Sequence, residues 1–301
     1  MKEISAFLSH LQYEKRFSVH TLTAYESDLS QLIEYLQKQY ELSDITQATH
    51  FYIRSWIIAL MDAGINNKSV NRKITVLRTF FRFLLREKKI AKNPMLKIQA
   101  PKTKKTLPVF VDAKKMDQVL DQMPDDKKEV PEYELSRNKN IIGLFYMTGM
   151  RLSELVNLKL SDVDFYNLSV TVLGKRNKVR QIPITLKHKR ELSVYLEQRK
   201  SFLEEVSLQS EYLFLNNKGN KIYPKLVYRI VNKELKFATT NKKKSPHILR
   251  HSFATNMLNK GADINAIKEL LGHSSLAATQ VYTHNTIEKL KEIYKQAFPK
   301  A

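Results

Sequence analysis

A short segment rich in proline and lysine divides this chain into two parts, and this division limits how the chain can fold. The helical pattern of apolar residues ends at Asn93-Pro94. The sequence that follows, IQAPKTKKTLPVF, has two prolines, three lysines and no apolar periodicity. We therefore interpret residues 98–109 as a basic linker between two domains, residues 1–97 and residues 110–301. A length of 301 residues agrees with two domains of ordinary size.

The first part has the apolar spacing of about four helices. Ser18 is a candidate N-cap for the second helix, and a third helix is predicted over residues 47–63, before Gly64. A long basic helix is predicted over residues 68–89, where basic side chains could lie along phosphates. The apolar residues of this helix are at helical spacing and are expected in a core: Val70, Ile74, Leu77, Phe80, Phe81 and Leu84.

The second part mixes helices with a small sheet. A helix is predicted to begin near Asp112, and the polar residues 124–140 are predicted to form a surface loop before the apolar run IIGLFYM. Alternating apolar residues and turn signals within residues 162–183 predict a short antiparallel sheet. The remainder is helical in pattern, most clearly over residues 223–237 and 247–260. The expected fold class is therefore mainly α with a small antiparallel β-sheet.

The positive charge of the chain is concentrated in three segments. Lysine and arginine number 51 against 30 aspartates and glutamates, a net charge of +21, and residues 68–105, 171–190 and 212–260 together carry +29. The other residues together carry −8, so the charge is segregated rather than mixed over a solvated surface. We expect nucleic acid as the partner, ahead of an anionic membrane, because none of the three segments has the apolar face of an interfacial helix.

Other features exclude whole classes of protein. The chain has no cysteine, which excludes disulfides, thiolate zinc sites and a cysteine nucleophile. It has no apolar run near the ~18 residues of a membrane span. Its N-terminal residues include Glu3, Ser9 and His10, where a signal peptide would be apolar. We therefore expect a soluble, cytoplasmic protein that does not contact a membrane.

The sequence HILRHSFAT follows Pro246 and is predicted to open a helix. His247 and Arg250 are three residues apart, so both side chains lie on one face near the positive end of that helix, where they could bind one phosphate. His251 lies four residues after His247 and raises zinc binding as an alternative. Against zinc, Ile248 stands where the motif HExxH has its glutamate, and no third ligand is evident.

Two further blocks accompany this motif. TGMRLSEL places Arg151 after a glycine-bearing break between two helices, and LLGHSSLAATQVYTH places His273 after Gly272 and Tyr282 nine residues later. With the pattern GKxxK at Gly174, these blocks resemble the tyrosine recombinase (phage-integrase) family, most of all its bacterial Xer-type site-specific recombinases. The resemblance covers the full chain. It implies a SAM-like, helical N-terminal domain that binds core DNA and a C-terminal catalytic domain, which together form a C-shaped clamp around the duplex.

The resemblance also implies a role for each residue of the motifs. Arg151 and Arg250 would hold the non-bridging oxygens of one phosphodiester, and His273 would hydrogen-bond its phosphoryl oxygen. Tyr282 would attack the phosphorus and become a 3′-phosphotyrosine, and His247 would accept its proton. Fixed cations would stabilise the charge on the equatorial oxygens, so no metal, ATP or other cofactor is expected.

The resemblance further implies that Lys175 is the general acid that protonates the leaving 5′ oxygen. It lies in the turn between two predicted strands, and its assignment depends on its position directly after Gly174. Arg176, Lys178 and Arg180 are close by and are alternatives, with contact to the minor groove or the DNA backbone as their other role. The expected DNA contacts of the whole chain are Lys68, Arg72, Arg78, Arg82, Lys178, Arg180 and Arg229.

Residues 286–298 have an apolar stripe at helical spacing, which would pack on its own domain or, as the resemblance implies, dock on a neighbouring protomer. The implied assembly is a homo- or hetero-tetramer on two double-stranded DNA sites, with a second recombinase or a DNA translocase as further partners. The preferred activity is site-specific recombination that resolves chromosome or plasmid dimers, in chromosome partition and cell division. The alternatives are an integrase or invertase of a mobile element, a type IB topoisomerase and a non-enzymatic DNA-binding protein.

Overall fold

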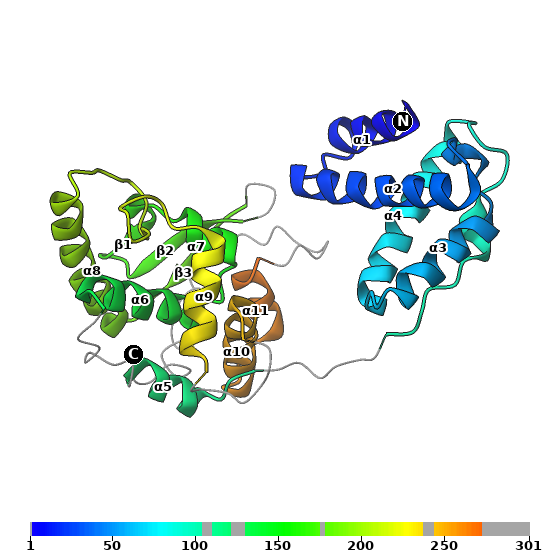
Figure 1. Cartoon of the computed structure of the whole chain (residues 1–301). Helices are drawn as coiled ribbons and strands as arrows, with labels where there is room; N and C mark the ends of the chain where they lie inside the picture. Colours follow the sequence, from blue (N-terminus) through cyan, green and yellow to red (C-terminus); the bar gives the residue numbers. More distant parts are fainter. Residues whose placement is uncertain (1, 104–109, 122–129, 175–177, 237–243, 273–301) are drawn as a thin grey trace. The chain divides into compact units, whose positions relative to one another are not determined.

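The structure is a computed structural model of the chain, and Figure 1 shows how its elements follow one another. The chain separates into two compact units, Met1–Thr106 and Leu107–Ala301, and each has its own hydrophobic core. Within the part of the chain that the structure describes, no helix is long and apolar enough to cross a membrane. The described residues are 2–103, 110–121, 130–174, 178–236 and 244–272.

The first unit is built from helices (Figure 1). In chain order they are α1 (Lys2–Ser9), the π-helical turn η1 (His10–Glu14), α2 (Val19–Tyr40), the 3-10 turn η2 (Ile45–Gln47), α3 (His50–Asp62), α4 (Asn67–Arg86) and the 3-10 turn η3 (Pro94–Lys97). Ser18 occupies the N-cap position of α2, as expected. The third helix begins later than expected, because Ala48 and Thr49 have extended backbone between η2 and α3.

The apolar stripe of α4 lies at the centre of the first unit's core, as predicted. All six residues of the stripe are at most 1% exposed: Val70, Ile74, Leu77, Phe80, Phe81 and Leu84. Phe80 packs edge-on against Phe7 of α1, with ring centroids 5.2 Å apart. Beside the stripe, the buried carboxylate of Asp28 on α2 accepts hydrogen bonds from Arg72 and Lys73 of α4. Apolar packing and a buried ion cluster therefore join α2 to α4.

Residues 98–102, which we call the strap, are bonded to α4. The side-chain amide of Asn67 donates to the carbonyl of Lys102 (2.8 Å), and that of Asn71 donates to the carbonyl of Pro101 (2.9 Å). Further along α4, Nη2 of Arg78 donates to the carbonyl of Ile98 (3.0 Å). These donors satisfy strap carbonyls that have no place in a helix or a strand. The segment expected to begin the linker therefore starts as part of the first unit.

The second unit contains helices and a small antiparallel sheet (Figure 1). Strands β1 (Val163–Asp164), β2 (Ser169–Leu173) and β3 (Val179–Pro183) are paired in that order, which confirms the predicted sheet and the fold class. Two pairs in the β2–β3 register, Val170 with Ile182 and Val172 with Arg180, are buried. The helical elements are α5 (Ala113–Asp121), α6 (Glu132–Thr148), α7 (Leu152–Asn157), the 3-10 turn η4 (Leu160–Asp162), α8 (Leu186–Glu205), α9 (Pro224–Glu234), α10 (Pro246–Asn259) and α11 (Ile264–Leu270).

Helix α6 packs against α8 and α10 in the core of the second unit, and it corrects one expectation. Residues 132–140, expected within a surface loop, form the first half of this helix. Tyr133 and Arg137 are buried there, and Nη1 of Arg137 donates to the carbonyl of Leu215 (3.1 Å) and to Oδ1 of Asn217 (2.7 Å). The polar composition did not indicate a buried helix face, because the hydrogen-bond partners of Arg137 lie about 80 residues further along the chain.

Candidate active site

The turn between α6 and α7 positions Arg151. Helix α6 ends at Gly149, whose φ of 59° is in the left-handed region that favours glycine. A Cβ at this position would lie 2.6 Å from Cδ1 of Phe253 and 2.7 Å from Cδ2 of Leu271, so the close packing of α10 and α11 also requires glycine. Arg151 follows as the N-cap residue of α7. Its backbone N–H donates to Oε2 of Glu154 (2.7 Å), which fixes the carboxylate at the start of the helix.

Glu154 is a buried carboxylate between two arginines. Its side chain is 3% exposed, and it accepts hydrogen bonds from Nη1 of Arg151 (2.9 Å) and, at both oxygens, from Nη1 and Nη2 of Arg180 (2.9 and 2.8 Å). Burial alone would raise the pKa of Glu154, but the hydrogen bonds from Arg180 and Arg151 outweigh it and lower the pKa to about 2. The carboxylate is therefore ionised throughout the physiological pH range.

Three arginines from different elements bond to the end of α11. Nε of Arg180 on β3 donates to the carbonyl of Leu270 (2.6 Å), Nη2 of Arg250 on α10 to that of Leu271 (2.6 Å), and Nη2 of Arg151 to that of Gly272 (3.0 Å). The last carbonyls of a helix have no partner within it and carry partial negative charge, so they suit guanidinium donors. Three consecutive carbonyls thus hold the three arginines together.

Arg250 is buried and links this group to the turn before Arg151. Its Nη1 donates to the carbonyl of Gly149 (2.6 Å). Burial and then the positive charge of Arg151 lower its pKa to about 10, which still leaves the guanidinium protonated at neutral pH. Three guanidinium groups and the one carboxylate of Glu154 leave two positive charges uncompensated within this group. Chemically, the arrangement is suited to an anion with several oxygens, such as a phosphodiester.

His247 lies in the first turn of α10, three residues before Arg250. It is exposed, and its ring packs edge-on against the exposed ring of His251, with centroids 5.3 Å apart and planes at 72°. The predicted helix after Pro246 is present, with Pro246 as its first residue.

The structure brings together Arg151 and Arg250, which sequence reasoning paired. The other three predicted catalytic residues, Lys175, His273 and Tyr282, lie outside the described residues, as does the tail 286–298. The described residues include the residue directly before Lys175, Gly174, and the residue directly before His273, Gly272. Gly174 and Lys178, on either side of residues 175–177, are joined by a hydrogen bond from the Gly174 N–H to the Lys178 carbonyl (2.7 Å).

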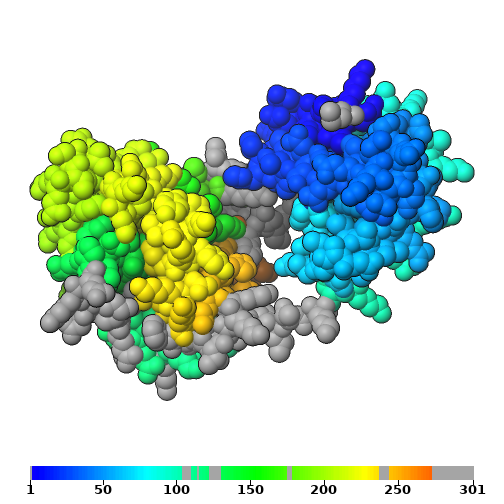
Figure 2. All heavy atoms as spheres, viewed as in Figure 1, coloured from blue at the N-terminus to red at the C-terminus, as the bar shows by residue number. Residues whose placement is uncertain are grey.

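Most of the expected DNA contacts are exposed cations. Lys68, Arg78 and Arg82 are exposed on α4, and Lys178 is exposed at the start of the β3 side of the hairpin. Arg72 is half-exposed but holds Asp28. On α9, which covers part of the face of the second unit seen in Figure 2, exposed Arg229 donates to the hydroxyl of Tyr223 (2.9 Å).

Arg180 differs from the expectation of a DNA contact. Its side chain is 7% exposed and bonds inward to Glu154 and Leu270, so a phosphate at the surface cannot reach it in this structure. Sequence reasoning missed this role, and it missed Glu154 altogether. Two signals were present: Arg180 is two residues before the apolar Ile182 and so lies on the same, inward face of the strand, and Glu154 is three residues after Arg151 on a helix.

Comparison with known families agrees with this fold. Residues 110–289 match the model of the phage integrase family, and residues 4–88 match the model of the phage integrase N-terminal SAM-like domain. The chain therefore belongs to the phage integrase family, as the three sequence blocks predicted.

Individual relatives make the class more specific. The chain is 36% identical to the tyrosine recombinase XerC of Chlorobaculum parvum, over 99% of this chain and 94% of that protein. It is 35% identical to the tyrosine recombinase XerC of Oceanobacillus iheyensis, over 99% and 96%. It shares its fold with the XerH site-specific recombinase bound to palindromic difH in a post-cleavage complex (TM-score 0.72, 23% identity, 97% of this chain and 84% of that one). The chain is thus a DNA recombinase of the tyrosine type, similar to XerC.

Proposed function

We propose that the protein cuts and rejoins double-stranded DNA at specific sites through a 3′-phosphotyrosyl intermediate on Tyr282. The observation that carries this proposal is the convergence of Arg151, Arg180 and Arg250 on the carbonyls at the end of α11. Only two of the three, Arg151 and Arg180, also bond to the carboxylate of Glu154, so two positive charges are left over. The segregated charge of the chain and the close relationship to XerC proteins support duplex DNA as the substrate.

In the proposed reaction, the Tyr282 hydroxyl attacks phosphorus while the bond to the 5′ oxygen breaks. A tyrosine hydroxyl with a pKa near ~10 must lose its proton during attack, and His247 accepts it. Arg151, Arg250 and His273 together stabilise the negative charge that builds up on the non-bridging oxygens. This stabilisation lowers the free energy of the transition state by several kcal/mol. Each ~1.4 kcal/mol of such stabilisation is a factor of ten in rate.

Lys175 protonates the leaving 5′ oxygen in the same step. The energy of the broken phosphodiester is kept in the tyrosyl ester, so the 5′ hydroxyl of another strand can reverse the reaction without ATP. Two arginines and a lysine supply the positive charge that metal ions supply in many nucleases, so the proposal requires no metal.

The biological role we favour is resolution of chromosome or plasmid dimers by a tetramer on two sites in the cytoplasm, with docking through residues 286–298. The names of the relatives support it, since they are XerC proteins matched over nearly their full length. An integrase or invertase of a mobile element would use the same chemistry. A type IB topoisomerase would relax supercoils without a partner site, and a non-enzymatic DNA-binding protein would form no covalent adduct.

A suicide substrate tests the chemistry. A duplex nicked close to the cleavage position releases a short fragment after attack, and the covalent adduct is trapped on a denaturing gel. We expect the wild-type chain to form the adduct and Tyr282→Phe to form none. The matched control is Tyr166→Phe, because Tyr166 is 93% exposed in the turn between β1 and β2 and outside the proposed site. An adduct with Tyr282→Phe would show that another residue is the nucleophile.

A further inference from the structure

Arg180 points into the second unit from β3 and bonds to two different elements. Nη1 and Nη2 hold both oxygens of Glu154 on α7, and Nε donates to the carbonyl of Leu270 at the end of α11. Glu154 in turn bonds to Arg151 through both the backbone N–H and the guanidinium of that residue. Arg180 therefore reaches the proposed phosphate clamp through one intermediate carboxylate.

The guanidinium of Arg180 also lies between two glycines. A Cβ built on Gly174 would lie 3.2 Å from Nη1 of Arg180, and a Cβ built on Gly272 would lie 3.2 Å from the same nitrogen. Both distances are shorter than ordinary contact, so the backbone at each glycine is packed on the guanidinium. Gly174 directly precedes Lys175 in the sequence and Gly272 directly precedes His273. The same side chain is thus in contact with the chain immediately before two motif residues.

Resting on the proposed function, we propose that Arg180 is a positioning residue for DNA cleavage. It keeps Glu154 ionised and in place, so that Glu154 orients Arg151, and it sets the backbone at Gly174 and Gly272 relative to that arginine. It does not touch the DNA itself. This role requires the planar fork of arginine, because one lysine ammonium cannot hold two carboxylate oxygens in parallel and a carbonyl on its other side.

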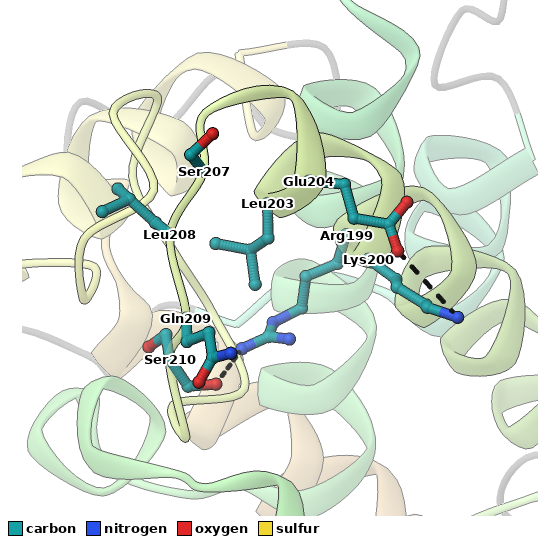
Figure 3. Close-up of a pocket in the computed structure, with 8 residues that line it drawn as sticks. All are labelled: Arg199, Lys200, Leu203, Glu204, Ser207, Leu208, Gln209 and Ser210. Carbon is teal, nitrogen blue, oxygen red and sulfur yellow. Dashed lines mark hydrogen bonds and ion pairs between the residues drawn. The ribbon is translucent and has the colours of Figure 1, made fainter.

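The second unit contains another buried arginine, Arg199, that lies outside the proposed site and serves as a comparison. Arg199 on α8 is 5% exposed, and its Nη2 donates to the carbonyls of Ser210 (2.8 Å) and Tyr212 (2.7 Å). Figure 3 shows it in a pocket at the end of α8, with its guanidinium directed toward Ser210 and with none of the proposed catalytic residues among those that line the pocket. Arg199 is therefore a matched control for the cost of losing a buried guanidinium.

The test compares Arg180→Gln and Arg180→Lys with Arg199→Gln in the full chain. Three quantities are measured: the single-turnover rate of adduct formation at saturating suicide substrate, the Kd for an intact duplex site, and the thermal unfolding midpoint. We expect both Arg180 variants to cleave about a hundredfold more slowly, as expected when catalytic groups are displaced by about 1 Å. We expect their Kd to stay within about twofold, because Arg180 is not in contact with DNA. Arg199→Gln should unfold at lower temperature but cleave at the wild-type rate.

A double-mutant cycle identifies the route of the effect. If Arg180 acts through Glu154, the variant with Arg180→Gln and Glu154→Gln should cleave little more slowly than either single variant, because the two residues act as a unit. Wild-type cleavage by both Arg180 variants, a loss no larger than that of Arg199→Gln, or a loss confined to Kd would overturn the proposal. An additive double mutant would overturn the route through Glu154. Failure of the wild-type chain itself to form the adduct would instead overturn the proposed function.

Discussion

At the scale of single residues, Glu154 sets the net charge of the site. One buried carboxylate accepts hydrogen bonds from Arg151 and Arg180, and the carbonyls at the end of α11 complete the shell of the arginines. Without the carboxylate, positively charged groups would face one another in a poorly solvated place, which costs several kcal/mol. With it, the group keeps enough positive charge to attract a phosphodiester. The balance thus depends on one side chain.

The depressed pKa of Glu154 predicts a pH-dependent contribution to stability. The folded pKa of about 2 lies below the ordinary value of 4.5, so the contribution is fully present above pH 4.5 and is lost as the pH falls toward 2. We expect Glu154→Gln to lower the free energy of unfolding by about 3 kcal/mol at pH 7, and the difference from wild type to narrow below pH 4.5. Urea unfolding across this pH range measures it.

The matched control for this prediction is Glu197→Gln, which removes an exposed carboxylate from α8. An exposed side chain without a buried partner should change stability by less than about 0.5 kcal/mol. A gap between wild type and Glu154→Gln that stayed constant from pH 7 to pH 3 would contradict the assigned role of the carboxylate.

At the scale of elements, α4 has two roles that use different faces. Its apolar face fills the first core, and its polar side chains hold the strap, residues 98–102, at three carbonyls. The strap carries Lys102, a cation of the expected linker, and the hydrogen bond from Asn67 to the Lys102 carbonyl holds this residue beside α4. The basic surface of the first unit is therefore built from a helix and a segment without regular structure.

Removing the two asparagines that hold the strap should loosen it. Each hydrogen bond contributes about 1 kcal/mol, or about 2 kcal/mol for the two, so we expect Asn67→Ala with Asn71→Ala to increase tryptic cleavage after Lys102 by roughly thirtyfold. Mass spectrometry of limited digests measures the rate at that bond. The control is Thr75→Ala with Thr79→Ala, whose hydroxyls donate to carbonyls within α4 and do not contact the strap. Equal cleavage of wild type and the asparagine variant would show that these bonds do not hold the strap.

At the scale of the whole molecule, the net charge of +21 consists of three strongly basic segments and an acidic remainder. The structure assigns these segments to α4 and the strap, to β2, β3 and the start of α8, and to the stretch that contains α9 and α10. In each, exposed cations such as Arg82, Lys178 and Arg229 accompany buried ones such as Arg180 and Arg250. Part of the basic sequence therefore builds the site rather than the surface.

The exposed part predicts a steep dependence of DNA binding on salt. Lysines and arginines that neutralise several phosphates displace counterions, so the logarithm of the affinity falls linearly with the logarithm of the salt concentration. For six or more phosphate contacts, we expect a loss of about 10³-fold or more between 50 and 200 mM salt. Fluorescence anisotropy on a duplex across this range measures the slope of log affinity against log salt concentration. Arg82→Gln should make this slope shallower by about one unit, the amount expected for the loss of one phosphate contact. A nearly flat dependence would contradict the placement of the charge on a DNA-binding surface.

The sequence alone is sufficient for the features that depend on local periodicity and on motifs. It predicted the core stripe of α4 from Val70 to Leu84, the antiparallel sheet, the helix that begins at Pro246, and the family. Such features could be predicted because a helix or a strand repeats within a few residues, so the pattern and its cause lie in the same window.

Which polar residues are buried, and what they bond to, depends on contacts between segments that are distant in the sequence. The polar composition of residues 124–140 predicts a surface loop, yet Arg137 within that stretch is buried and donates to a carbonyl 78 residues away. Arg180 was predicted to face DNA, yet it bonds to Glu154, 26 residues before it, and to Leu270, 90 residues after it. A buried charge is stable only with its partners, and those partners meet only when distant segments pack together. The motifs therefore named the arginines of the clamp, and the packing of α7, β3, α10 and α11 brought them together.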